Sequence, residues 1–344
     1  MSRLRVHVLY EYGVELHAYC SGHIRLLRPL AHPSVADSIA LTSGRSFDGH
    51  HCDVVIVERL WRPDIDLDKA QRLIERVRDA GAKLVYSQDD DFGALYDSVD
   101  RPPWLSTMHM KVMDLFAREA KAILVSTEAL KRKMSALNPH IFVIPNALDE
   151  RLATAPPPRG GERGGLVIGY MGTRTHDEDL ALIGPALRAL LTKHPDVEVQ
   201  VVGGVTRKLD FGTRVRTIDV PPSEADYPLF MLWFMSTRRW DIGLAPLRDN
   251  AFNACKSDIK FLDYGALGAA SLFSDVPPYA AVASDQTGIV VDNDPAAWNE
   301  ALERLVCDHP LRAEVSNRAY DVVHATRTLR RRAVDWRDAL HQLL

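Results

Sequence analysis

Two lysines and a carboxylate recur at helical spacing in the second half of the chain. Lys256, Lys260 and Asp263 are separated by four and three residues, so a helix beginning near Lys256 would carry all three on one face. They follow an apolar strand pattern, Asp241–Pro246, and a long polar loop. A helix N-terminus with two lysines attracts a diphosphate, and an acid one turn further on accepts hydrogen bonds from ribose hydroxyls. The spacing predicts a phosphate-binding site, with a surface salt bridge as the structural alternative.

A glycine turn follows the predicted strand Leu166–Tyr170 in the same half of the chain. Gly172 and Thr173 lead into Arg174, and a helix is expected to begin near Asp177. A glycine lets a ligand approach the backbone, an arginine binds phosphate through its planar fork, and a helix N-terminus favours an anion. Alternatively, the turn itself requires the glycine, and Asp177 only caps the helix.

Carboxylates also gather after a predicted strand in the first half, at Asp89, Asp90 and Asp91. An Asp-x-Asp unit can hold Mg²⁺ or Mn²⁺ against a diphosphate. The phosphate-binding patterns lie in the second half, however, so we expect no metal here and favour a role at a second substrate or in the structure. A further turn, Asn146–Asp149, precedes a linker and is typical of a capped hinge.

Composition limits the classes of protein that could carry such sites. The 344 residues are 46% hydrophobic and 26% charged, as in globular chains, and the length predicts roughly two domains. The net charge of −4 argues against a protein that coats nucleic acid. The four cysteines form no CxxC pair, and no apolar run approaches the ~20 residues of a membrane span. Because the N-terminus also lacks a signal-peptide pattern, we expect a cytoplasmic protein.

Short apolar runs alternate with amphipathic segments of helical length along the chain. Runs that are apolar on both faces and separated by helices are typical of parallel sheets, so we predict two doubly wound α/β domains. The predicted strands are Leu4–Leu9, Val54–Val57, Lys83–Tyr86, Ala122–Val125, Ile141–Ile144, Leu166–Tyr170, Val197–Val202, Val215–Asp219, Asp241–Pro246, Ala270–Ser274 and Gly288–Val291. The predicted helices include Leu67–Ala80, Thr127–Leu137, Leu180–Lys193 and Pro295–Val306.

A stretch rich in proline and glycine, Ala155–Gly165, interrupts this alternation and predicts a linker. We therefore place one domain at residues 1–150, the linker at 151–165 and a second domain at 166–325. A C-terminal helix follows at 326–344 and is a candidate for packing back onto the first domain. Its arginines predict either a solvated basic face or peripheral contact with an anionic membrane.

Three segments together resemble the donor domain of family 4 GT-B glycosyltransferases. They are Ile168–Thr173, Asp241–Leu247 and Lys256–Gly268. Two earlier segments, Ser126–Leu130 and Ile144–Asp149, resemble the last segments of that family's N-domain. The resemblance covers about residues 120–280 and extends to the N-terminal third only in the alternation of strands and helices.

The resemblance implies a GT-B fold, in which two Rossmann-like doubly wound parallel-sheet domains face each other across a cleft. The first domain would bind the acceptor and the second a nucleotide-sugar donor. The family transfers a sugar, here expected to be a hexose, with retention of configuration and without a metal or a cofactor. A glycan, lipid-linked or other hydroxyl acceptor is expected, in cell-surface polysaccharide or glycoconjugate assembly, either in the cytoplasm or at the inner face of the membrane.

Individual residues of the donor domain carry this resemblance. Asp263 matches the second acid of the family's Glu-x7-Glu motif, which holds the ribose, whereas the first acid falls at Cys255. Gly172 and Arg174 match the glycine turn and the basic residue that faces the diphosphate. The expected donor-binding residues are Gly172, Thr173, Arg174, Lys256, Ser257, Asp258, Lys260 and Asp263.

The expected catalytic residues are Arg174, Lys260 and Asp89. The lysine that usually follows the family's turn is missing, and Lys256 or Lys260 would supply its charge on the departing diphosphate. The family's N-domain histidine has no clear counterpart, and Asp89 or Asp90 is a candidate for its place. The expected acceptor-binding residues are His23, Arg25 and Asp90.

Two other classes of protein stay open. A GT-B-like sugar-nucleotide epimerase or phosphorylase would also use two α/β domains and a phosphate site. It would need a catalytic acid pair or a cofactor lysine, and the sequence shows no pattern for either. Because Cys255 replaces the first acid, a non-catalytic sugar-nucleotide-binding protein is the other alternative.

Overall fold

The structure, a computed structural model, describes residues 3–153, 165–173, 176–203 and 214–344. The chain divides into two compact units. Unit 1 comprises Met1–Asp149, Cys255–Ser257 and Leu329–Leu344, and unit 2 comprises Glu150–Ala254 and Asp258–Thr328.

The chain passes between the two units after Asp149, Ala254, Ser257 and Thr328. The predicted boundary near residue 150 lies beside the first of these passages, whereas the short return of Cys255–Ser257 to unit 1 was not predicted. Residues 154–164, which form most of the predicted linker, lie outside the described residues.

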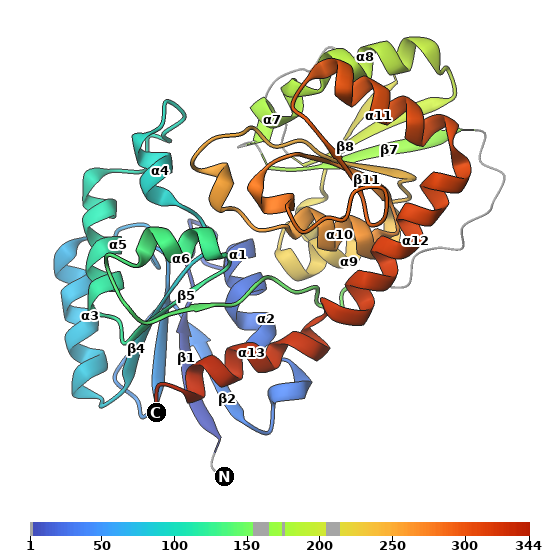
Figure 1. Cartoon of the computed structure of the whole chain (residues 1–344). Coiled ribbons are helices and arrows are strands. Elements are labelled where there is room, and N and C mark those ends of the chain that lie inside the picture. Colours follow the sequence, from blue (N-terminus) through green and yellow to red (C-terminus); the bar gives the residue numbers. More distant parts are fainter. Residues whose placement is uncertain (1–2, 154–164, 174–175, 204–213) are drawn as a thin grey trace. The chain divides into compact units, whose positions relative to one another are not determined.

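Unit 1 contains a six-stranded parallel sheet in the order β2-β1-β3-β4-β5-β6 (Figure 1). All the residues of β3 and β5 are buried, because helices cover both faces of the sheet at its centre. The strands are β1 (Leu4–Leu9), β2 (Ile39–Gly44), β3 (Val54–Glu58), β4 (Lys83–Gln88), β5 (Ala122–Val125) and β6 (Ile141–Val143).

Unit 2 contains a second six-stranded parallel sheet, in the order β12-β11-β10-β7-β8-β9. This is the strand order of a Rossmann fold, in which β7 is the first strand of this sheet along the chain and β10 is the fourth. The strands are β7 (Leu166–Met171), β8 (Val197–Val202), β9 (Val215–Ile218), β10 (Ile242–Ala245), β11 (Ala270–Ser274) and β12 (Ile289–Val291).

All the strands predicted from the sequence are present, and the prediction of two doubly wound sheets is confirmed. The strand that the sequence pattern did not reveal is β2, at the edge of the first sheet. Only Ile39 of this strand is buried, and its second half carries the small and polar residues Thr42, Ser43 and Gly44. An edge strand with so little apolar surface has no continuous hydrophobic run to mark it.

Helices flank both sheets. Those of unit 1 are α1 (Cys20–Gly22), α2 (Arg28–Leu30), α3 (Leu67–Asp79), α4 (Phe92–Asp97), α5 (Thr107–Glu119), α6 (Glu128–Met134) and α13 (Leu329–His341). Those of unit 2 are α7 (Asp177–Leu182), α8 (Gly184–Lys193), α9 (Tyr227–Thr237), α10 (Ile259–Leu267), α11 (Pro295–Cys307) and α12 (His309–Thr326). A π-helical segment, His23–Leu27, joins α1 to α2, and a 3₁₀ turn at Pro33–Val35 follows them.

Two of the predicted helices begin or end elsewhere. The segment Leu180–Lys193 is two helices, α7 and α8, because Pro185 at the start of α8 cannot continue the helix before it. The helix predicted to start near Lys256 begins at Ile259. Its expected first turn is instead a short excursion of the chain into unit 1.

The C-terminal helix α13 completes the core of unit 1. It lies beside α2 (Figure 1), and its buried face includes Leu329, Trp336 and Leu340. The Trp336 indole N–H donates to the backbone carbonyl of Arg25 at 2.5 Å, and the Arg25 guanidinium carbon lies 5.5 Å from the indole ring centroid. The predicted C-terminal helix therefore packs by its apolar face, while Arg330 and Arg331 remain exposed.

Among the described residues, no helix is both long enough and apolar enough to cross a bilayer.

We predict that Trp336→Ala lowers the free energy of unfolding by about 3–5 kcal/mol, because it leaves a cavity where a fully buried indole filled the core. Urea unfolding of the full chain measures this change. Arg331→Ala, on the exposed face of the same helix, is the matched control and should change stability by less than about 0.5 kcal/mol. Equal losses in the two variants would contradict the packing described for α13.

Candidate functional site

Each sheet has a point at which the strand order reverses direction, between β1 and β3 in unit 1 and between β7 and β10 in unit 2. Ligands of doubly wound folds bind outside the carboxyl ends of the strands at such switch points. In unit 2, Gly172 and Thr173 directly follow β7, and the polar loop from Pro246 follows β10. The predicted donor-site turn therefore lies at the switch point of its sheet.

Tyr264 of α10 joins the two strands at this switch point. The backbone N–H of Met171, the last residue of β7, donates to the Tyr264 hydroxyl at 3.0 Å. That hydroxyl in turn donates to the carbonyl of Leu244 in β10 at 3.1 Å. Burial raises the pKa of Tyr264 far above its ordinary value, so the hydroxyl keeps its proton. Helix α10 is consequently fixed in position beside the ends of both strands.

The turn after β7 is packed too closely for a side chain at Gly172 or at the neighbouring Gly203. Gly203, which follows β8, has a left-handed φ of +101°, and a Cβ there would lie 2.1 Å from the carbonyl oxygen of Gly172. A Cβ on Gly172 would lie 2.7 Å from the Tyr170 hydroxyl oxygen. Crowding by the Tyr170 side chain, and not a left-handed backbone in the turn, is thus the structural reason for glycine at position 172. Arg174, which was also predicted to bind the donor, lies outside the described residues.

Lys260 and Asp263 lie together on α10, but they are not on an exposed face as predicted. They are only 8% and 5% exposed, so the alternative of a surface salt bridge is also wrong. The Lys260 ammonium lies 4.3 Å from the ring centroid of Tyr170, a cation–π contact at a desolvated position. Burial raises the pKa of Asp263 to about 7, and the nearby charge of Lys260 partly opposes this rise. A buried cation and an acid one helical turn away are therefore present at the switch point.

The predicted grouping of Lys256 with Lys260 and Asp263 on one helical face is wrong. Lys256 and Ser257 precede the helix and belong to unit 1. There the Ser257 hydroxyl accepts a hydrogen bond from the Asn146 amide at 2.8 Å.

Asp258, also predicted to bind the donor, forms a two-pronged ion pair within unit 2. Its carboxylate accepts from the two terminal nitrogens of Arg327, at 2.9 Å each. These partners hold the start of α10 against the end of α12. Asp258 therefore helps to position α10 through its ion pair with Arg327.

Asp179 of α7 organises the loop that follows β10, and the sequence reading did not select it. Its carboxylate accepts from His176 Nδ1 at 2.7 Å and from the backbone N–H of Arg248 at 2.8 Å. The Arg248 Nε atom lies 3.6 Å from the same carboxylate. Although burial favours the neutral acid, these contacts hold the pKa of Asp179 below its ordinary value. Besides Lys260, unit 2 therefore has a second cation, Arg248, on the loop that follows β10 at the switch point.

In unit 1, one guanidinium gathers three carboxylates at the ends of β1, β3 and β4. Arg59 Nε lies 2.7 Å from Asp89, Nη2 lies 3.2 Å from Asp90, and Nη1 lies 3.4 Å from Glu11. Arg59 has a φ of +45°, which is uncommon and costly for a residue with a side chain. The predicted residues Asp89 and Asp90 are thereby brought together, with side chains that are 19% and 24% exposed.

Glu58, the last residue of β3, lies buried beside this cluster. Its carboxyl oxygens accept from the Ser21 hydroxyl at 2.6 Å and from the Glu11 backbone N–H at 2.8 Å. Burial raises the pKa of Glu58 to about 8, and Arg59 acts in the opposite direction. The sequence contained a signal for this residue, since Glu58 ends an otherwise apolar strand, but our reading did not use it.

The predicted acceptor residues His23 and Arg25 lie on the π-helical segment after α1. Single π-turns inside helices often mark functional sites. Arg25 is 1% exposed and donates to the Asn146 side-chain oxygen at 2.8 Å and to the carbonyl of Ile144 at 2.5 Å. Burial lowers its pKa to about 10. These contacts give Arg25 a structural position in unit 1, whereas His23 is half-buried.

Known structures share this architecture, although no protein-family model and no curated protein matches the sequence. HepE from Anabaena, solved in complex with UDP and glucose, has a TM-score of 0.66 at 11% identity, over 99% of this chain and all of that one. Sucrose-phosphate synthase from Thermosynechococcus elongatus has a TM-score of 0.60 at 13% identity, over 85% of this chain and 74% of that one. The pneumococcal O-GlcNAc transferase GtfA, with UDP and GlcNAc, has a TM-score of 0.59 at 12% identity, over 85% and 57%.

The two doubly wound parallel sheets and these likenesses show that the chain has the GT-B fold. At 11–13% identity the likenesses define the fold alone. The cleft between the two units stays a prediction.

Glu58 provides a pH test of the site in unit 1. The folded chain keeps the Glu58 proton up to about pH 8, whereas the unfolded chain loses it near 4.5, so this group destabilises the folded state as the pH rises between these values. We predict that wild type loses stability relative to Glu58→Gln over this range, by at most about 1.4 kcal/mol per pH unit. Urea unfolding at several pH values measures the difference.

Glu75→Gln, at an exposed position of α3, is the control and should follow the wild-type pH profile. Parallel profiles for wild type and Glu58→Gln would contradict the raised pKa.

Proposed function

We propose that the chain is a glycosyltransferase that moves a hexosyl group from a nucleotide-diphosphate sugar to a hydroxyl acceptor, with retention of configuration. The observation that carries this proposal is the buried Lys260 ammonium with Asp263 one turn further along α10, at the switch point of the sheet in unit 2. The shared fold of structures solved with UDP and glucose, or with UDP-glucose, supports it.

The chemical demand of this reaction is to stabilise the departing nucleoside diphosphate. In our proposal, Lys260 and Arg248 approach the diphosphate from unit 2, and Gly172 and Thr173 lie where its oxygens would meet the backbone. Arg174 joins them as a proposed catalytic residue. Asp263 would accept hydrogen bonds from the ribose hydroxyls, which favour its ionised form over the neutral one.

The acceptor side of the proposal lies in unit 1. Asp89 and Asp90 are fixed by Arg59, and their side chains are 19% and 24% exposed, so we propose that a sugar or other hydroxyl donor binds to them. Asp89 is the proposed catalytic group of this unit, and His23 and Asp90 are proposed acceptor contacts. As the resemblance suggests, the acceptor would be a glycan or a lipid-linked molecule of cell-surface glycoconjugate assembly.

Arg59 also supports catalysis without a metal ion. Its guanidinium contacts Asp89, one of the two carboxylates that an Asp-x-Asp metal site would use. The other, Asp91, accepts from the backbone N–H of Ala94 and lies 3.6 Å from the Lys133 ammonium. We predict that excess EDTA leaves the rate of sugar transfer within about twofold of its value in buffer, since cationic side chains neutralise the leaving group. A strict requirement for Mn²⁺ would instead identify Asp89–Asp91 as a metal site.

Nucleotide binding tests the donor site directly. We predict that the full chain binds and slowly hydrolyses at least one of UDP-, GDP- or dTDP-linked sugars, as measured by calorimetry and by release of free sugar. Lys260→Met should weaken binding of the matching nucleoside diphosphate by at least about tenfold, because a charge-assisted hydrogen bond is lost. The thioether side chain fills similar space, so circular dichroism should report an intact fold.

Arg188→Met removes a cation from an exposed position of α8 and is the matched control. It should bind as the wild type does. If no nucleotide sugar binds to wild type, or if both variants lose affinity equally, the proposed donor site is wrong.

A second candidate is a protein that binds nucleotide sugars without transferring them. Cys255, at the position of the first acid of the family motif, lies in unit 1, where its sulfur is 3.7 Å from an Asp91 oxygen. It is therefore placed in a different unit from Asp263. Binding of a nucleotide sugar with no detectable hydrolysis or transfer would favour this candidate.

A further inference from the structure

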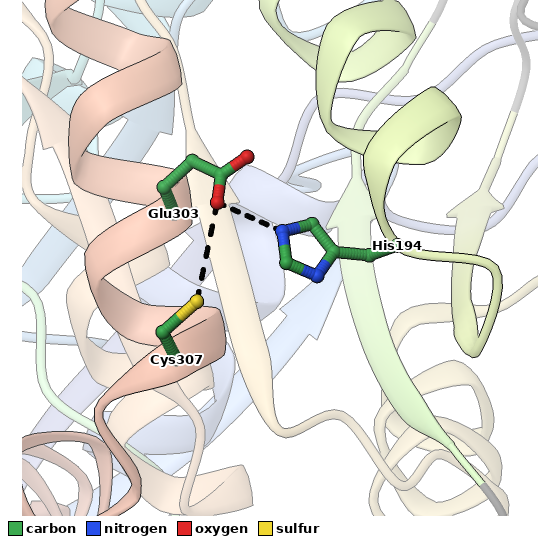
Figure 2. A group of neighbouring side chains, drawn as sticks. All are labelled: His194, Glu303 and Cys307. Carbon is green, nitrogen blue, oxygen red and sulfur yellow. Dashed lines mark hydrogen bonds and ion pairs between the residues drawn. The ribbon is translucent and has the colours of Figure 1, made fainter.

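A histidine, a glutamate and a cysteine meet in unit 2, away from the switch point. His194 follows the last residue of α8, and Glu303 and Cys307 lie one turn apart on α11 (Figure 2). One nitrogen, oxygen or sulfur atom from each lies within 4.8 Å of those of the other two. The imidazole Nε2 and the Glu303 Oε2 are 2.8 Å apart, and the Cys307 sulfur is 3.9 Å from the same oxygen.

We propose that His194, Glu303 and Cys307 bind a zinc ion. Zinc accepts nitrogen, oxygen and sulfur ligands at about 2.0–2.3 Å, so the donor atoms of a tetrahedral site stand roughly 3.3–3.8 Å apart. In the structure, the Nε2–Oε2 distance of 2.8 Å is shorter than this range, and the Sγ–Oε2 distance of 3.9 Å is slightly longer. Opening the 2.8 Å contact by about half an ångström, which a rotation of the Glu303 side chain supplies, makes room for the ion.

The chemistry of the three donors favours zinc over other divalent ions. Magnesium and calcium prefer oxygen ligands only, whereas imidazole and thiolate together suit zinc. The side chains of His194 and Glu303 are 21% and 17% exposed, and Cys307 is exposed, so an ion can reach them from solvent. With three ligands from the protein, water would complete the tetrahedron.

The backbone holds the ligands in place. The N–H of His194 donates to the carbonyl of Leu190 at 2.9 Å, and the His194 carbonyl accepts from Arg214 at 2.6 Å. Glu303 and Cys307, four residues apart on α11, present their side chains on one helical face. Only side-chain rotations are therefore needed to close the site.

Lys193 competes with a metal ion for the same carboxylate. Its ammonium lies 2.9 Å from Glu303 Oε2, and its side chain is 66% exposed. A side chain this exposed moves into solvent at little cost, whereas its charge near the ion would weaken metal binding. Removing that charge should therefore strengthen the site.

The zinc site lies at the amino-terminal edge of the sheet in unit 2. His194 precedes β8, which begins at Val197, whereas Gly172 and Thr173 follow the last residue of β7 at the opposite edge. The ion would link the end of α8 to α11 and would not contact the residues of the proposed donor site. Its presence or absence is thus independent of the proposed transfer reaction.

Metal titration of the full chain tests the proposal. After chelator treatment, the protein should bind one Zn²⁺ per chain in competition with a chromophoric chelator. Co²⁺ alone should produce the near-ultraviolet absorption of a thiolate–cobalt bond. Cys307→Ser should remove this absorption and weaken Zn²⁺ binding by at least tenfold, and Glu303→Gln should also weaken binding. Lys193→Met should bind Zn²⁺ more tightly than wild type.

Cys20→Ser replaces the other exposed cysteine and is the matched control. It should keep the wild-type affinity and the cobalt absorption. Zn²⁺ should also raise the thermal unfolding midpoint of wild type and of Cys20→Ser but not that of Cys307→Ser. Wild type that binds no Zn²⁺ at micromolar concentration, or binding that survives in both Cys307→Ser and Glu303→Gln, would overturn the proposal.

Discussion

The buried ammonium group of Lys260 is the interaction on which the candidate site of unit 2 depends. Removing a cation from water costs several kcal/mol unless the surroundings compensate. For Lys260 the surroundings are the face of the Tyr170 ring and the charges of Asp179 and Asp263. The Tyr264 hydroxyl, which bonds to β7 and to β10, fixes the helix that carries Lys260 and Asp263 beside the strand that carries Tyr170. In the proposed function, this buried positive charge is in place before the anionic diphosphate binds.

In unit 1, by contrast, carboxylates outnumber the cation, because three of them surround the guanidinium of Arg59. Arg59 contacts Glu11, Asp89 and Asp90, and its left-handed backbone is the cost of reaching all three. Glu58 lies next to this group and keeps its proton at neutral pH because a further buried negative charge would be uncompensated. Each unit thus places buried charged side chains at the switch point of its sheet.

The sequence predicted most of the fold because strands in a parallel sheet are buried on both faces and leave continuous apolar runs. Residues at strand ends, such as Gly172, were also found in this way. Contacts between distant parts of the chain had no such signal. Arg59 meets Asp89 across 30 residues, and Arg25 meets Trp336 across 311, so neither pairing follows from local spacing. Lys256 does not lie on the predicted helical face, because hydrogen bonds such as that from Asn146 to Ser257 hold its segment in unit 1.

The last helix of the chain has a consequence for biosynthesis. Because Leu329–Leu344 belongs to unit 1, the sheet formed by the first 149 residues lacks one of its covering helices until this segment has been translated. The site that Trp336 fills beside Arg25 would stay open to solvent on the ribosome while the whole of unit 2 is being made. Unit 1 therefore completes its native packing only after unit 2 has been synthesised, although most of unit 1 is synthesised first.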